Sequence, residues 1–229
     1  VRYRRVADSV NAERIDGDSL RAEGFLNMMP RWAPDGRRLA YLSNRGGDYG
    51  RMGLFIAGRK DSADARVTGA VTGADWSPDG KKLILSKRSE PDRNGSRYWD
   101  LYEVAPGARG ASPRRLTRGL RATRPSVSPD GSRIAFIRNG GGDANLCVST
   151  ADGSGVRALT VFRDGGQAYT PRWSPDGRRI ALSFSVGEQR DIAVVSVEEG
   201  KVETLIASDE TDRDPCWSPD GRRLLFSSD

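Results

Sequence analysis

A motif that occurs five times in register constrains the fold of this chain more than any other feature of its sequence. The five copies read RWAPDGRRLAYLS, DWSPDGKKLILSK, SVSPDGSRIAFIR, RWSPDGRRIALSF and CWSPDGRRLLFSS. They recur with a period of roughly 45 residues, which is typical of architectures built from stacked repeats. A Trp precedes the turn in every copy except the third, which has Val127 there.

The Pro-Asp-Gly core of the motif has the chemistry of a tight turn between two strands. Pro suits the second position of a type I turn, the Asp side chain can bond nearby backbone amides, and Gly adopts positive φ. We therefore predict a three-residue hairpin loop in every copy, with structural rather than catalytic aspartates. The predicted turn residues are Pro34, Asp35, Gly36, Pro78, Asp79, Gly80, Pro129, Asp130, Gly131, Pro175, Asp176, Gly177, Pro219, Asp220 and Gly221.

Short apolar runs follow each turn at regular distances. After a first run such as RIAFIR come GLFIAG (53–58), WDLYEV (99–104), NLCVST (145–150) and DIAVVSV (191–197), and then RRLT (114–117), VRALT (156–160) and VETLI (202–206). Each repeat thus predicts four short strands, a to d, which cannot bury both faces alone. Stacking such units around an axis buries them, so we predict an all-β fold, a β-propeller of four-stranded antiparallel blades. Four full repeats and a partial fifth fit a five- or six-bladed ring.

Taken together, the W-S-P-D-G turns and the D-L-Y-E-V and R-R-L-T strands resemble the WD-like repeat of TolB-like β-propellers, over residues 25–229. Such repeats occur in TolB and in propellers attached to peptidases. The resemblance implies a non-catalytic interaction module of a bacterial envelope protein, periplasmic or otherwise extracytoplasmic, that binds a protein or peptide partner. As an alternative, it implies a substrate-gating propeller of a larger peptidase whose catalytic domain lies outside this chain.

Residues 1–24 precede the first repeat and have two interpretations. Tyr3, Val6 and Val10 follow helical spacing, which favours a linker or the helix tail of an upstream domain. On that interpretation the chain is a fragment of a larger ring. Alternatively, Asp18–Arg21 aligns with the RRLT ends of later repeats and belongs to a strand that closes the fifth blade. No signal peptide is visible in the charged stretch VRYRR at the start.

Composition excludes several classes of function for this chain. It has no histidine, which excludes the Ser-His-Asp triad, the Cys-His pair and every His-ligated metal site within it. The net charge of +6 comes from 37 basic residues interspersed with 31 acidic ones, so we predict no nucleic-acid partner. No apolar run approaches the roughly 18 residues that a membrane span needs.

The cysteines and paired aspartates are the remaining candidates for redox or metal chemistry. We expect Cys147 and Cys216 to be small buried thiols rather than a disulfide. Two aspartate pairs could bind calcium, but neither completes an EF-hand pattern, so solvated turns are the favoured interpretation. These pairs are Asp16 with Asp18 and Asp212 with Asp214. We therefore predict no catalytic residue, no metal site and no cofactor.

The connections between strands supply the binding hypothesis. In an a–b–c–d blade the b–c and d–a connections lie together on one face, around the mouth of the central channel, and we call this the loop-rich face. Its loops are long and contain aromatic residues and arginines, which are enriched in interface hot spots. We predict that a partner binds there. The candidate residues are Tyr49, Arg51, Arg93, Tyr98, Arg121, Arg124, Phe162 and Tyr169.

Overall fold

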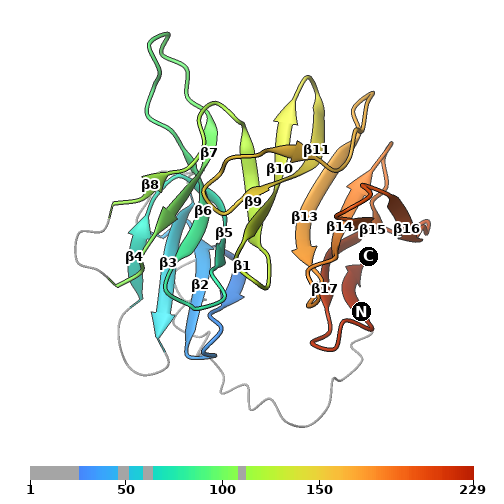
Figure 1. The fold of residues 1–229 in the computed structure, drawn as a ribbon, viewed down its shortest axis with the longest axis horizontal. Helices are drawn as coiled ribbons and strands as arrows, with labels where there is room; N and C mark the ends of the chain where they lie inside the picture. Colours follow the sequence, from blue (N-terminus) through green and yellow to red (C-terminus); the bar gives the residue numbers. More distant parts are fainter. Residues whose placement is uncertain (1–25, 46–51, 59–63, 108–111) are drawn as a thin grey trace.

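The fold consists of short β-strands joined by turns (Figure 1). A computed structural model describes residues 26–45, 52–58, 64–107 and 112–229, and all regular structure in these ranges is β-strand. The predicted all-β fold is therefore confirmed. The two interpretations of residues 1–24 fall outside the described residues.

The strands form five groups along the chain, which we call blades 1 to 5. Blade 1 contains β1 (Asn27–Trp32), β2 (Arg38–Ser43), β3 (Gly53–Gly58) and β4 (Ala65–Thr68). Blade 2 contains β5 (Val71–Trp76), β6 (Leu83–Arg88), β7 (Trp99–Val104) and β8 (Arg114–Arg115). Blade 3 contains β9 (Ala122–Val127), β10 (Arg133–Gly140), β11 (Asp143–Thr150) and β12 (Arg157–Ala158). Blade 4 contains β13 (Gln167–Trp173), β14 (Arg179–Ser185), β15 (Asp191–Ser196) and β16 (Val202–Ile206), and blade 5 contains β17 (Asp212–Trp217) and β18 (Leu224–Ser228).

Within each blade the strands pair antiparallel in chain order, as the repeats predict. Blades 3 and 4 also meet through a parallel pairing of Ala144 with Gln167. Blades 1 and 2 lie on one side of the molecule and blades 4 and 5 on the other, with β9 and β10 of blade 3 between them (Figure 1). The chain thus forms an arc of blades, and each blade packs its face against the next.

The Pro-Asp-Gly turns show why the motif recurs. In the first copy the Gly36 amide donates to the Ala33 carbonyl, and Gly36 has a φ of 62°. The Ala33 amide donates to the Arg38 carbonyl, so four residues lie between these partners rather than the predicted three. The same bonds recur in the other four copies. A fourth loop residue accommodates the type I turn together with the left-handed glycine that returns the chain.

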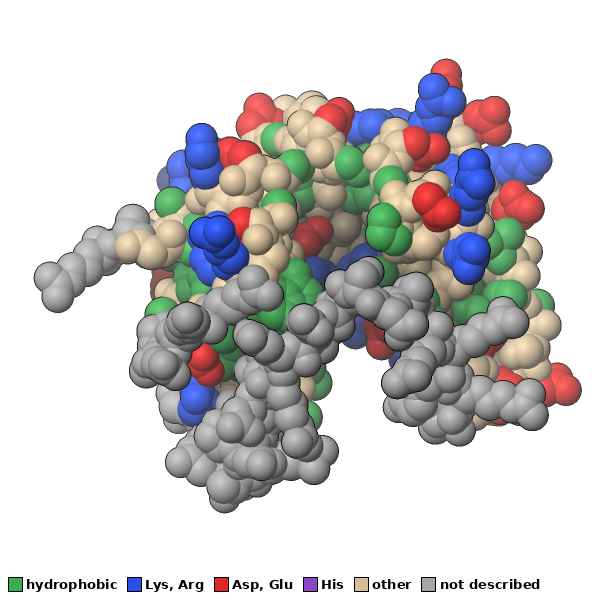
Figure 2. All heavy atoms as spheres, turned by 90° about the horizontal axis from the view of Figure 1, so that it is seen from below, with side chains coloured by type: hydrophobic (Ala, Val, Ile, Leu, Met, Phe, Trp, Pro, Cys, Tyr) green, Lys and Arg blue, Asp and Glu red, His purple; other side chains and the backbone are tan. Residues whose placement is uncertain are grey.

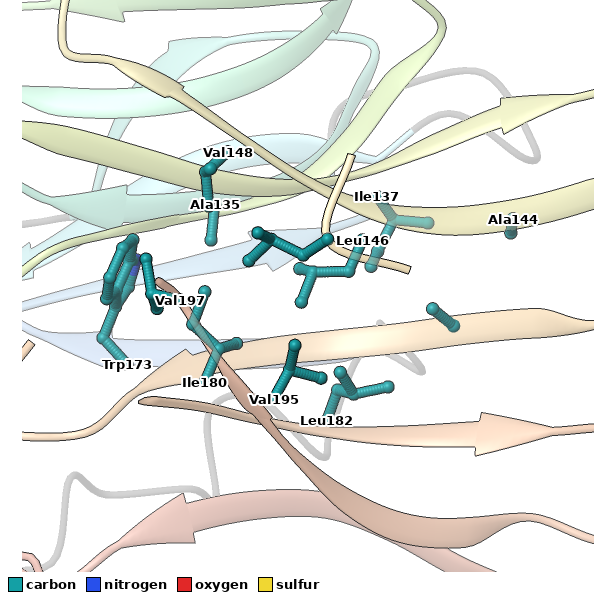
Figure 3. Close-up of a cluster of buried hydrophobic side chains, with 12 residues drawn as sticks. Ala135, Ile137, Ala144, Leu146, Val148, Trp173, Ile180, Leu182, Val195 and Val197 are labelled. Atoms are coloured by element: carbon teal, nitrogen blue, oxygen red, sulfur yellow. The ribbon is translucent and has the colours of Figure 1, made fainter. Parts of the chain in front are cut away.

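The core consists of apolar side chains between facing blades. Between blades 3 and 4, Leu146 of β11 lies opposite Ile180 and Leu182 of β14, and all three are fully buried (Figure 3). Similar clusters fill the spaces between blades 1 and 2 and between blades 2 and 3. Burying one such side chain contributes about 1.5–3 kcal/mol. The free energy of folding therefore depends on contacts between repeats, because a single four-stranded blade has no second layer.

An arginine and a tryptophan clamp neighbouring blades together at three boundaries. Arg133 of blade 3 lies over the Trp173 ring of blade 4, at 4.9 Å, and donates to the Gly177 carbonyl at 3.1 Å. In return, the Trp173 indole donates to the Ser126 carbonyl of blade 3 at 3.0 Å. The same contacts join Arg38 to Trp76 and Arg179 to Trp217. Each clamp combines cation–π attraction with two hydrogen bonds.

The boundary between blades 2 and 3 uses a different contact, because the third repeat has Val127 in place of Trp. Here the Val127 amide donates to the Asp75 carboxylate of blade 2 at 2.9 Å. Lys82 takes the place of the clamp arginine and pairs instead with Glu103 of its own blade at 3.2 Å. The position that departs from the sequence pattern is therefore the one where the packing changes.

Two expectations from the sequence are wrong in detail. Cys147 is buried, and its burial raises the pKa of its thiol to about 11, whereas Cys216 is exposed. Both cysteines are free. Asp212 does not lie in a solvated turn: it starts β17 and is buried. The Asp212 amide donates to the Arg190 carbonyl and its carboxylate accepts from the Ser208 hydroxyl, and the local sequence does not encode the contact with Arg190.

The clamp predicts unequal effects for two tryptophans of the same motif. Trp173 is 8% exposed and Trp32 is 57% exposed. Trp173→Ala should lower the free energy of unfolding by about 3–5 kcal/mol, because it opens a cavity and removes the indole hydrogen bond to the Ser126 carbonyl. Trp32→Ala should change it by about 0.5 kcal/mol or less. Urea denaturation of both variants measures the difference, and equal losses would contradict the role assigned to the clamp.

The turn carboxylates predict an acid-dependent loss of stability. Hydrogen bonds from Ser128 and Ser132 lower the pKa of Asp130 to about 2. A carboxylate with a lowered pKa stabilises the fold above the ordinary value near 4, and this contribution is lost as the pH falls towards 2. Ser132→Ala should raise the pKa of Asp130 towards its ordinary value in an NMR titration. Asp176 serves as the internal control, since its turn has Arg178 in place of Ser132 and its pKa should not move.

Candidate functional site

A central cavity of about 1470 Å³ lies among the first strands of the blades, which we call the inner strands. Strands β1, β5, β9 and β13 line it, together with the β6–β7 connection on the loop-rich face. Because the first strand of four successive blades contributes, the cavity lies on the axis around which the blades are arranged. From below, the space-filling view shows a hollow between the two halves of the arc (Figure 2). This cavity is therefore the candidate binding site.

Each inner strand contains a bulge that changes the direction of its side chains. The register of every a–b strand pair shifts in the same part of the repeat. Four of the bulges place a residue with positive φ directly before a proline: Met29, Arg124, Thr170 and Asp214. A non-glycine residue in this conformation costs roughly 1–3 kcal/mol, and bulges commonly redirect a side chain towards a site. Met29 and Arg124 at this position both line the cavity.

Arg124 and Arg190 share one aromatic ring beside the cavity. The guanidinium carbon of Arg190 lies 3.9 Å from the centre of the Tyr169 ring, and that of Arg124 lies 5.5 Å from it. Burial lowers the pKa of Arg124, the negative charge of Asp214 opposes this shift, and the positive charge of Arg190 adds a smaller lowering. Arg124 also makes a long hydrogen bond of 3.4 Å to the Thr170 hydroxyl. The cluster is therefore a partly desolvated pair of like charges.

A second arginine–tyrosine pair lies on the same cavity wall. Arg121 has a φ of 56° and lies 5.9 Å from the centre of the Tyr98 ring. Tyr98 ends the β6–β7 connection, and its backbone is fixed by hydrogen bonds with Ser89. Trp99, the first residue of β7, is half-buried and also lines the cavity. Aromatic rings and guanidinium groups thus come together from two blades.

The structure brings four of the predicted candidates to the cavity and places the others elsewhere. Tyr98, Arg121, Arg124 and Tyr169 all line the cavity. Arg93 is exposed in the β6–β7 connection and is not part of that lining. Phe162 packs at the edge of the core between blades 3 and 4. Tyr49 and Arg51 lie outside the described residues.

The sequence analysis missed two features of the loop-rich face. The first is Arg190, which the sequence did not single out because it is an isolated charge directly before β15. It contacts Tyr169 because β13 passes close to the β14–β15 loop. The second feature is an apolar patch where the rings of Phe162 and Phe184 stack at 5.7 Å. Val161 and Val186, beside them in the chain, are 71% and 69% exposed. The available signal was that the apolar residues Phe184 and Val186 alternate with serine at the end of β14.

The motif carboxylates are engaged in their own turns. In each copy the first oxygen of the aspartate accepts a hydrogen bond from the backbone amide two residues later. In the four copies with Ser before Pro, the serine hydroxyl donates to the same oxygen. These bonds lower the pKa of every one of the five carboxyl groups. A carboxylate held ionised in this way is poorly suited to proton transfer near neutral pH.

Asp100 is a buried carboxylate that the sequence analysis did not single out. It accepts hydrogen bonds from the Thr117 hydroxyl and from the Gly119 and Leu120 amides, and it pairs with Arg115 at 2.6 Å. The contacts fix the β8–β9 connection to β7. In the third repeat Asn145 binds the corresponding connection in a similar way. Both residues therefore shape the loops of the loop-rich face without facing the cavity.

The described residues contain no group of three or more Cys, Asp or Glu side chains placed to hold a metal ion. Asp212, one of the aspartates considered for calcium, is buried with one carboxylate oxygen that has no hydrogen-bond partner within the described part. No helix with the length and hydrophobicity of a membrane span occurs there either.

Relatives of this chain include a Tol-Pal system protein and a peptidase. It is 35% identical over 91 residues to "Tol-Pal system protein TolB" of Alcanivorax borkumensis, a match to 36% of this chain and 20% of that protein. It is 33% identical over 128 residues to "Uncharacterized peptidase YuxL" of Bacillus subtilis, a match to 54% of this chain and 18% of that protein. The matches thus span about a fifth of the length of each relative.

The structural comparison agrees with the blade architecture. A solved structure described as TolB from Agrobacterium tumefaciens superposes with a TM-score of 0.72 and 26% identity, over 89% of this chain and 70% of that one. The family model PD40, the TolB beta propeller domain, matches residues 17–168 and 110–229. The chain therefore belongs to the TolB β-propeller domain family.

Proposed function

We propose that this chain is a non-catalytic interaction module of a bacterial envelope protein and that it binds a protein or peptide partner on its loop-rich face. The observation that carries the proposal is the gathering of exposed apolar and aromatic–arginine groups on that one face. The Phe162–Phe184 patch and the cavity residues Tyr98, Arg121 and Tyr169 all belong to it. Aromatic and arginine anchors beside an apolar patch are typical of interface hot spots.

The similarity to a Tol-Pal system protein supports an extracytoplasmic location for such a module. The lack of histidine, together with motif carboxylates that are engaged in turns, supports a non-catalytic role for this chain. Its blades form a rigid scaffold, and loops on a rigid scaffold are where binding concentrates in many folds.

A second candidate function is that of a propeller that gates substrate for a larger peptidase. The match to a peptidase of Bacillus subtilis over more than half of this chain favours it. On this alternative the axial cavity is a passage and the catalytic domain lies outside this chain. The two functions differ in where a ligand acts: a partner protein stays bound to the loop-rich face, whereas a peptidase substrate passes along the axis.

A pair of charge insertions on opposite faces tests the partner-binding proposal. Val161→Glu with Val186→Glu places two carboxylates in the apolar patch of the loop-rich face. Val156→Glu with Val202→Glu inserts two carboxylates on the opposite face, at an exposed valine of the β11–β12 turn and at the exposed first residue of β16. With the chain as bait in a bacterial envelope extract, the first variant should retain at least tenfold less of the captured partner, because buried charge at an interface is costly. The second variant should retain as much as the unmodified chain.

Equal retention by both variants would overturn the assignment of the loop-rich face. Melting temperatures within a few degrees of the unmodified chain serve as the folding control, since all four valines are exposed.

A further inference from the structure

The wall of the central cavity carries an excess of positive charge. Among the described lining residues the cations outnumber the single acid, Glu90. The cations are Lys87, Arg88, Arg97, Arg121 and Arg124. The surface of the chain as a whole is a nearly balanced mixture of acids and bases. The charge of the cavity wall is therefore a local property that favours an anionic ligand.

Arg124 and Arg190 are the cations whose positions are least explained by the fold. Neither lies within ion-pair distance of a described carboxylate, although the charge of Asp214 attracts Arg124 from farther away. Both lie against the Tyr169 ring, so two like charges are held close together beside the cavity. The left-handed backbone of Arg124, with a φ of 52°, adds a conformational cost at the same point. By contrast, the clamp arginines have both a ring and a carbonyl acceptor in the next blade.

An anion between the two guanidinium groups would relieve their repulsion. A carboxylate matches the planar donor fork of arginine and can accept two parallel hydrogen bonds from it. In a partly desolvated site such bonds are stronger than on an open surface. The rings of Tyr169 and Tyr98 also line the cavity, each beside an arginine. Both rings provide surfaces for neighbouring groups of the ligand.

The size of the cavity favours an extended peptide over a small metabolite. Its volume of about 1470 Å³ exceeds the 300–1,000 Å³ that is usual for small-molecule pockets. It also opens among the long loops of the loop-rich face, where a chain segment can enter. We propose that Arg124 and Arg190 form a carboxylate-binding site that anchors an Asp- or Glu-containing segment of the partner. This inference rests on the proposed function and specifies the chemistry of the partner.

Peptide binding to matched charge variants tests this proposal. The probes are a fluorescent, capped peptide of alternating Asp and Gly and its counterpart with Asn in place of Asp. The test variant combines Arg124→Gln with Arg190→Gln. The control combines Arg178→Gln with Arg222→Gln, two exposed arginines beside the Pro-Asp-Gly turns, so that the net charge changes equally. Fluorescence anisotropy is measured with the whole 229-residue chain.

The acidic peptide should bind the unmodified chain and the control variant with dissociation constants within twofold of each other. Its binding to the test variant should be at least tenfold weaker, and the Asn peptide should not saturate any of them. Arg124→Lys with Arg190→Lys should weaken binding severalfold, because the charge remains and the planar fork is lost. This variant and the single change Arg190→Gln also test the proposal if the double Gln variant does not fold.

Equal binding of the acidic peptide to the test and control variants would overturn the site, and so would an absence of binding to the unmodified chain. Displacement of the peptide by millimolar inorganic phosphate, with equal affinity for phosphate and peptide, would identify a general anion site and refute peptide recognition. If the valine variants lose the partner while the arginine variants do not, the proposed function stands and the carboxylate site fails.

Discussion

The contact between a clamp arginine of one blade and a tryptophan of the next is the interaction on which the rest of the structure depends. It links strand b of one repeat to strand a of the following repeat, and the arginine also reaches the Pro-Asp-Gly turn of that following repeat. The indole donates to a carbonyl of the preceding blade and the guanidinium donates to a carbonyl of the following blade, so hydrogen bonds cross each boundary in both directions. Blades held at a fixed angle in this way place their loops and inner strands at repeatable positions around the axis.

Much of this architecture could be predicted from the sequence because its determinants are local. Turn chemistry, strand alternation and the repeat period each depend on residues close together in the chain. Burial at the ends of the arc could not be predicted, since it depends on which face has a neighbour. Trp32 and Trp173 occupy the same motif position, yet one is mostly exposed and the other is buried. Cys216 differs from the expectation for the same reason.

The candidate site was predictable in its location and only partly in its membership. Long loops rich in arginine and tyrosine identified the loop-rich face, and Arg121, Arg124 and Tyr169 meet at its cavity. Arg190 could not be found in this way, because its loop joins strands b and c of a blade whose inner strand carries Tyr169. Only the three-dimensional return of the chain brings the two together. Arg93 belongs to the β6–β7 connection, another loop rich in arginine, but its side chain is exposed and does not line the cavity.

The bulge in the inner strands separates what the repeat determines from what each repeat is free to vary. Its left-handed residue and following proline recur in four blades, so the backbone geometry belongs to the scaffold. The side chains at that position are Met29, Arg124, Thr170 and Asp214, which share neither charge nor size. A scaffold that fixes the direction of these side chains and leaves their identity open can acquire a new binding specificity by single substitutions. The positive charge at Arg124, reinforced by Arg190 from a neighbouring loop, is one such choice among those the fold permits.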